Sequence, residues 1–112
     1  MKTTRDFRLL TDRYHFDAGP CSYGNGFAQI DTRQDASYYG TWCSPTERTI
    51  VSFSEGDVTT RVCETDAEFV AEIRELVRWS DEAGYGPTTI DAMHHDALRC
   101  AFEKLGLRDL LH

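Results

Sequence analysis

The chain has 112 residues and a formal net charge of −7, and this length is typical of one domain that can bury a core. Hydrophobic residues make up 40% and charged residues 28% of the sequence, a composition that excludes a disordered chain. The excess of acidic side chains argues against direct binding to nucleic acid or to an anionic membrane, because both depend on Lys and Arg.

The first residues, Met1–Asp6, contain basic side chains but no apolar segment behind them, so no secretory signal is expected. No run approaches the roughly 20 apolar residues that cross a bilayer. We therefore expect a cytoplasmic protein, whose cysteines are thiols in a reducing compartment. The four cysteines contain no C-x-x-C pair, so neither a metal site nor a cofactor is expected; they are Cys21, Cys43, Cys63 and Cys100.

Residues 1–63 are expected to be mainly β. Within residues 7–16, Tyr14 and Phe16 alternate as in a strand, which we favour, although helical spacing also fits. Residues 17–26 are so rich in Gly, Pro, Asn and Asp that they predict a loop. A strand over 27–32 should follow.

Three further strands are predicted over 38–43, 48–54 and 58–63, and they are separated by turn residues. Such short connections favour an antiparallel meander. In that topology Cys43 and Cys63 flank the middle strand at roughly 9 to 10 Å, too far apart for the approximately 7 Å limit between disulfide-bonded Cα atoms.

Residues 64–112 are expected to be mainly α. The segment from Thr65 to Glu68 is a capping box, in which each side chain accepts a hydrogen bond from an otherwise unpaired backbone N–H. Apolar residues then recur at helical spacing as far as Ser80, and Gly84 is a typical helix stop. The stripe consists of Phe69, Val70, Ile73, Leu76, Val77 and Ser80.

A second helix is predicted to begin near Asp91 as N-cap and to end at Gly106. Its expected buried face is Met93, Ala97, Leu98, Ala101, Phe102 and Leu105. The tail, residues 107–111, should add one more helical turn. The fold class predicted for the single domain 1–112 is therefore α+β, with a mainly antiparallel sheet of four to five strands followed by two helices packed on one face.

No catalytic motif is specific enough to assign an enzyme. The Gly-rich segment 19–26 lacks the Lys and Ser/Thr of a phosphate-binding loop. A nucleophilic Cys21 would need a nearby imidazole from His15, His94 or His95. We expect His94 and His95 in the first turn of the second helix and His15 pointing outward, so enzyme activity is the less favoured interpretation.

Two groups of residues favour a binding protein instead. Glu68, Glu72 and Glu75 fall at three- and four-residue spacing on one helical face; such a row is usually a solvated surface, but it also resembles the negative face presented to a basic groove. The aromatics of the chain are more than one core readily hides, and exposed aromatics serve at protein interfaces; they include Tyr23, Tyr38, Tyr39, Trp42, Trp79 and Tyr85. From the two groups we predict that a protein partner contacts Glu68, Glu72, Glu75, Tyr38, Tyr39 and Trp42.

The hypothesis is therefore a small acidic, non-enzymatic protein that binds another protein. One concrete form is an inhibitor or adaptor acting on a basic or nucleic-acid-binding surface of a larger protein, as in phage and plasmid accessory proteins. Two alternatives remain open. One is a small cysteine-dependent enzyme or redox protein using Cys21, and the other is a ligand-binding or homodimeric α+β module.

Overall fold

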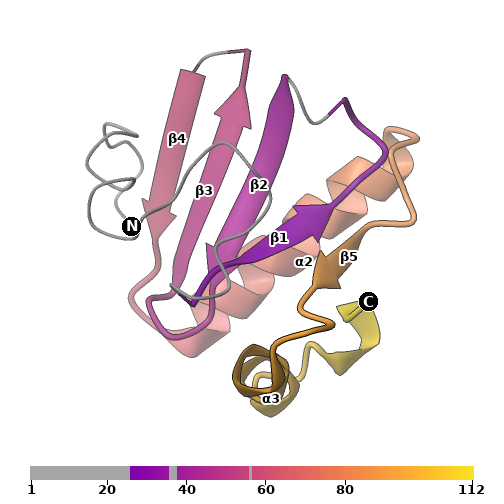
Figure 1. Ribbon diagram of the computed structural model, residues 1–112. Helices are drawn as coiled ribbons and strands as arrows, with labels where there is room; N and C mark the ends of the chain where they lie inside the picture. The colour runs from indigo at the N-terminus through magenta and orange to yellow at the C-terminus, as the bar shows by residue number, and fades with distance from the viewer. Residues whose placement is uncertain (1–25, 36–37, 56) are drawn as a thin grey trace.

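The computed structural model describes residues 26–35, 38–55 and 57–112. Within these ranges the elements, in chain order, are β1 (Ala28–Asp31), β2 (Tyr39–Ser44), β3 (Thr49–Ser54), β4 (Asp57–Val62), α2 (Asp66–Glu82), β5 (Thr89–Asp91), α3 (Asp96–Lys104) and the 3₁₀ turn η2 (Arg108–Leu110). The strands form one antiparallel sheet in the order β4-β3-β2-β1-β5 (Figure 1). The predicted α+β class and meander are confirmed.

Strands β1 to β4 lie within one residue of their predicted positions. The turn between β2 and β3 is held by Ser44, whose Oγ accepts a hydrogen bond from the Glu47 backbone N–H at 3.2 Å. The expected strand within residues 7–16 and most of the expected loop over 17–26 lie outside the described residues, as do Cys21 and His15.

Helix α2 begins and ends where local sequence signals place it. The Oγ1 atom of Thr65 accepts a hydrogen bond from the Glu68 N–H at 3.1 Å, and the Glu68 carboxylate accepts one from the Glu64 N–H at 3.4 Å. The second bond of the predicted capping box therefore reaches one residue earlier than expected. Gly84 follows the helix with a φ of 91°, a conformation that glycine adopts without a steric penalty.

The start predicted for the second helix is wrong. Asp91 is the last residue of β5 and pairs with Gln29 of β1, so it cannot serve as the N-cap. His95 takes that place, because its Nδ1 accepts a hydrogen bond from the Leu98 N–H at 3.1 Å. His94 and Met93 consequently precede the helix, and Met93, predicted to be buried, is 45% exposed.

One core lies between the sheet and both helices. Helix α2 crosses one face of the sheet obliquely, and α3 lies at its β5 end (Figure 1). Side chains alternate between the two faces of a strand. Ile50 of β3 therefore joins Ile73 of α2 and Phe102 of α3 in the core, whereas its neighbour Val51 pairs with the buried Trp42 on the opposite face. On the predicted face of α3, Leu98 and Phe102 are buried but Ala97 is exposed.

The C-terminal residues fold back onto the sheet and onto α2. The expected extra helical turn is confirmed by η2. Beyond it Leu111 forms a parallel bridge with Ile90 of β5, and the His112 N–H donates to the Ile90 carbonyl at 2.9 Å. Arg74 of α2 donates two hydrogen bonds to the Asp109 carboxylate, at 2.9 and 3.0 Å. These contacts fix the tail against both layers.

Candidate binding groove

A groove lies between α2 and the sheet face that this helix crosses. Because α2 runs obliquely, it leaves the part of β3 and β4 farthest from its own N-terminus uncovered (Figure 1). The cavity there measures about 420 Å³. Its lining residues are Ile50, Ser52, Thr59, Arg61, Glu72, Glu75, Leu76 and Trp79. We call this surface the α2 groove.

A second hollow, of about 280 Å³, continues the groove toward β2. The two hollows share Ser52, Leu76 and Trp79, so they form one trough that passes beside these side chains. The second hollow is also lined by Tyr39 and Thr41 of β2.

The strand register explains why the space under the helix is not filled. Ile50 pairs with Arg61, and Ser52 pairs with Thr59, so all four side chains project toward α2. Ser52 and Thr59 are small and carry hydroxyls, whereas the core nearer to β1 is filled by larger side chains such as Ile30. Small residues at the uncovered end of the sheet thus produce a hollow.

Trp79 is the most prominent side chain of the groove. It is 56% exposed and lies off the buried stripe of α2, which consists of Phe69, Ile73, Val77 and Ser80. The Tyr85 ring lies beside it, with centroids 6.0 Å apart and planes tilted by 44°. A large exposed indole beside a cavity is typical of an interface hot spot.

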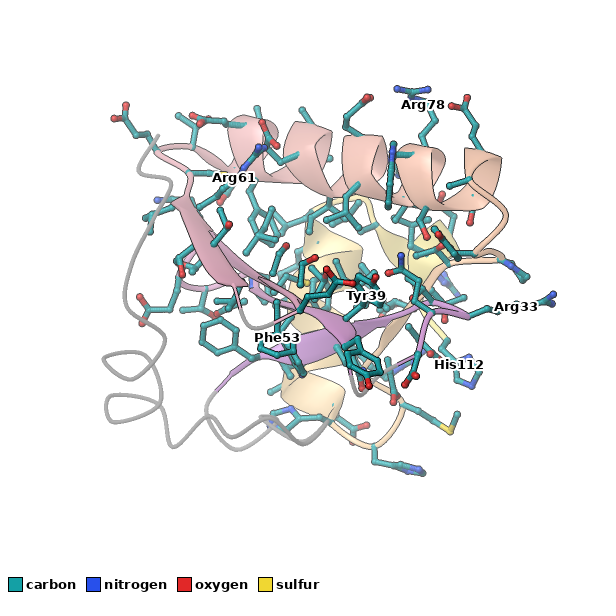
Figure 2. The ribbon with its side chains drawn as sticks, turned by 90° about the horizontal axis from the view of Figure 1, so that it is seen from above. Arg33, Tyr39, Phe53, Arg61, Arg78 and His112 are labelled. Carbon is teal, nitrogen blue, oxygen red and sulfur yellow. The ribbon has the colours of Figure 1, made fainter. Side chains whose placement is uncertain are left out.

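Charged residues border the groove on both walls. Arg61 of β4 donates to the Glu72 carboxylate of α2 at 2.5 Å, and this ion pair joins the sheet to the helix. Figure 2 shows Arg61 reaching toward α2, and Arg78 on the outer side of the same helix. Arg78 donates to the carboxylates of both Glu75 and Glu82, and its hydrogen bonding to Glu75, together with its positive charge, holds the pKa of Glu75 below the usual range.

Each of the three carboxylates in the predicted acidic row has a hydrogen-bond or ion-pair partner in the structure. Glu68 accepts a backbone N–H at the start of α2, Glu72 pairs with Arg61, and Glu75 pairs with Arg78. Of the three, Glu72 and Glu75 line the groove. The local charge is therefore less negative than the sequence spacing alone indicates.

The three predicted aromatics lie in different places. Tyr38 is 57% exposed and is not among the residues that line the groove. Tyr39 lines the second hollow, and its hydroxyl donates to Glu55 at 3.0 Å, an interaction that raises the pKa of Tyr39. Trp42 is only 3% exposed and lies on the sheet face opposite α2, so the structure does not bring it to the groove.

Trp79 was counted among the surplus aromatics of the sequence but was not selected as a site residue, and neither were Leu76, Arg61, Ser52 or Thr59. A signal for Trp79 was present, because an indole at a helical position outside the apolar stripe must face either solvent or a partner. The strand residues gave no comparable signal, since Ser and Thr on a strand are ordinary surface residues. Only the oblique crossing of α2 places them beside Trp79.

Three other features bear on function in the described part of the chain: a cysteine thiol, groups that could hold a metal ion, and the length and apolarity of the helices. Cys43 is completely buried, and desolvation raises the pKa of its thiol, which disfavours the nucleophilic thiolate. Within the described ranges, no group of three His, Cys, Asp or Glu side chains is placed to hold a metal ion. None of the helices described has the length and apolarity needed to cross a membrane.

Comparisons with protein-family models, with curated proteins and with solved structures found no match to this chain. The function must therefore be argued from the groove and its residues.

Proposed function

We propose that this chain is a non-enzymatic protein-binding domain of the inhibitor or adaptor type, and that the α2 groove receives the partner. The proposal rests on the exposure of Trp79. This residue is 56% exposed and lines a cavity of about 420 Å³. Covering such an indole removes a large apolar area from water, and Trp is among the residues most enriched in interface hot spots.

The shape of the groove favours a segment of a protein over a small molecule. Two hollows follow one another along the sheet, and exposed side chains such as Arg61, Glu75 and Trp79 form the walls. Sites for small ligands instead bury roughly 70–90% of the ligand surface. A chain segment lying along the trough would cover Trp79 and reach both hollows.

The charge of the molecule favours a basic partner. The net charge is −7, and most of the acidic excess lies from Glu64 onward, in the part of the chain that contains α2. Electrostatic complementarity increases the rate of association and excludes partners of like charge. A basic surface, such as one that a larger protein uses for nucleic acid, is the complement that this charge distribution fits.

Affinity capture with matched variants tests the proposal. Trp79→Ser removes the indole from the groove, whereas Tyr38→Ser removes an equally exposed aromatic that does not line it. The wild-type protein and Tyr38→Ser should retain the same partner from cells that produce this chain, and Trp79→Ser should lose it. Retention of every captured protein by Trp79→Ser, or no specific protein captured by the wild type, would contradict the proposal.

A further inference from the structure

The Trp79 ring has room on its face for a planar group. Its contact with Tyr85 is tilted by 44° at a centroid separation of 6.0 Å, so the two rings are not stacked. With 56% of the residue exposed, the indole presents much of its surface to the groove and to solvent. The negative face of an indole attracts cations, which makes Trp the best aromatic partner in cation–π contacts.

Residues that carry hydrogen-bond acceptors share the cavity with this ring. Glu75, Ser52 and Thr59 line the same cavity as Trp79. In the part of the chain that the structure describes, the side-chain hydroxyls of Ser52 and Thr59 make no hydrogen bond. The groove thus combines an aromatic residue, a carboxylate residue and hydroxyl groups, while Arg61, the one cation among its described lining residues, is already paired with Glu72.

From this combination we infer that the α2 groove recognises an arginine side chain of the partner, whose guanidinium stacks on Trp79 and donates hydrogen bonds to the Glu75 carboxylate. The inference rests on the proposed protein-binding function and names the chemistry of its central contact. Guanidinium is planar, so it can stack with its face on an indole while its N–H groups donate in the plane to a carboxylate.

Lysine fits this site less well. Its ammonium is a compact and strongly hydrated charge that cannot stack, and it loses more hydration than guanidinium when it enters a half-buried groove. The chain itself shows the preferred geometry, because Arg78 uses Nε and Nη2 together on the two oxygens of Glu75. An arginine of the partner would make the same bidentate contact with the Glu75 carboxylate.

The existing Glu75–Arg78 pair does not block the site. Both side chains are exposed, at 62% and 56%, and ion pairs at such exposed positions contribute little to stability. Arg78 also donates to Glu82 at 2.7 Å, and it keeps this partner when it releases Glu75. The exchange replaces an exposed ion pair by one that is covered by the partner and supported by Trp79.

The test uses the full chain and an N-acetylated, C-amidated Ala-Leu-Arg-Leu-Ala peptide, with versions in which lysine or the uncharged isostere citrulline replaces arginine. Chemical-shift titration should show the Trp79 indole N–H and the Ser52 and Thr59 amides responding to the arginine peptide. We expect binding about tenfold weaker with lysine and weaker still with citrulline. Equal binding of all three peptides, or shifts confined to residues outside the groove, would overturn the inference.

Substitutions in the groove provide a second test of the arginine site. Trp79→Leu and Glu75→Gln should each weaken binding of the arginine peptide about fivefold or more, whereas Glu103→Gln on α3 should leave it unchanged. The dispersion of the amide spectrum shows whether each variant is folded. If capture of the partner depends on Trp79 but the arginine peptide does not bind, the arginine inference fails and the protein-binding function stands. If the peptide binds but capture ignores Trp79, the proposed function fails.

Discussion

At the scale of single residues, the Trp42 ring lies so close to Gly40 that it leaves no room for a side chain at that position. A Cβ atom added at Gly40 would lie 2.6 Å from Cη2 of the Trp42 ring, well inside van der Waals contact. The ring is 3% exposed and pairs across the sheet with the completely buried Val51. It therefore cannot move aside without disturbing its neighbours.

Gly40→Ala is accordingly expected to reduce the free energy of unfolding by about 1–3 kcal/mol, the usual range for overpacking a core. Denaturant titration measures the effect. In a double-mutant cycle with Trp42→Phe, part of the loss should be recovered, because the smaller ring vacates the space that the new methyl group needs. Additive effects of the two substitutions would show that this contact does not constrain position 40.

A second residue-scale prediction concerns Asp109 and its pH dependence. The two hydrogen bonds from Arg74 lower the pKa of this carboxyl. A carboxyl whose pKa is lower in the folded state stabilises the fold above its unfolded pKa, about 3.9, and loses this contribution as the pH falls through the lowered value.

Asp109→Asn should therefore be less stable than the wild type at neutral pH, and the difference should become smaller as the pH is lowered from about 7 toward about 2. Urea unfolding at both pH values provides the comparison. A difference of the same size at both would show that the charge on Asp109 is not what holds η2 against α2.

At the scale of elements, the helix ends follow local chemistry. Thr65 is half of the capping box at the start of α2, and its Oγ1 is the acceptor for the Glu68 N–H. Thr65→Ala should cost about 1 kcal/mol, because it leaves this donor without an intramolecular partner. Thr46→Ala, at an exposed turn position, is the control and should change the urea midpoint little. Equal midpoints for both variants would contradict the assigned cap.

The elements that sequence reasoning placed correctly are those with local signals. Turn residues delimit β2 to β4, and caps delimit α2. Strand β5 gave no such signal, because it has only three residues and Asp91 at its end resembles a helix cap. What makes Thr89–Asp91 a strand is pairing with β1, which is distant in sequence.

The groove could not be predicted for a related reason. Its walls come from β3, β4 and α2, and the hollow depends on the angle at which α2 crosses the sheet. A pattern of apolar residues defines which face of a helix is buried, but it does not define the crossing angle. Glu72 and Glu75 were selected from their spacing. The sequence indicates that Trp79 can be exposed, but only the three-dimensional arrangement places it at the groove.

At the scale of the whole molecule, the question is whether a partner responds to the total charge or to the groove. A net charge of −7 creates a long-range field that attracts any basic protein. Glu75 acts at short range, since it lines the groove beside Trp79. Glu103 lies on α3, away from the lining residues, and is also exposed.

Two charge reversals separate these contributions. Glu75→Lys and Glu103→Lys each replace a charge of −1 by +1, so each changes the net charge from −7 to −5. Long-range steering should therefore fall by a similar amount in both, with a modest decrease in the association rate of a basic partner. Only Glu75→Lys places a positive charge against the bound partner, and it should weaken affinity about tenfold or more, mainly through faster dissociation.

Salt provides the control for these measurements, which surface-based kinetics can make once a partner has been captured. Raising the ionic strength from 0.1 to 1 M shortens the Debye length from about 10 Å to about 3 Å. The association rates of the wild type and both variants should then converge, while the faster dissociation of Glu75→Lys should persist, because a contact covered by the partner is screened less than the surface field. Equal loss of affinity in the two variants would mean that the overall acidic charge, and not the α2 groove, determines binding.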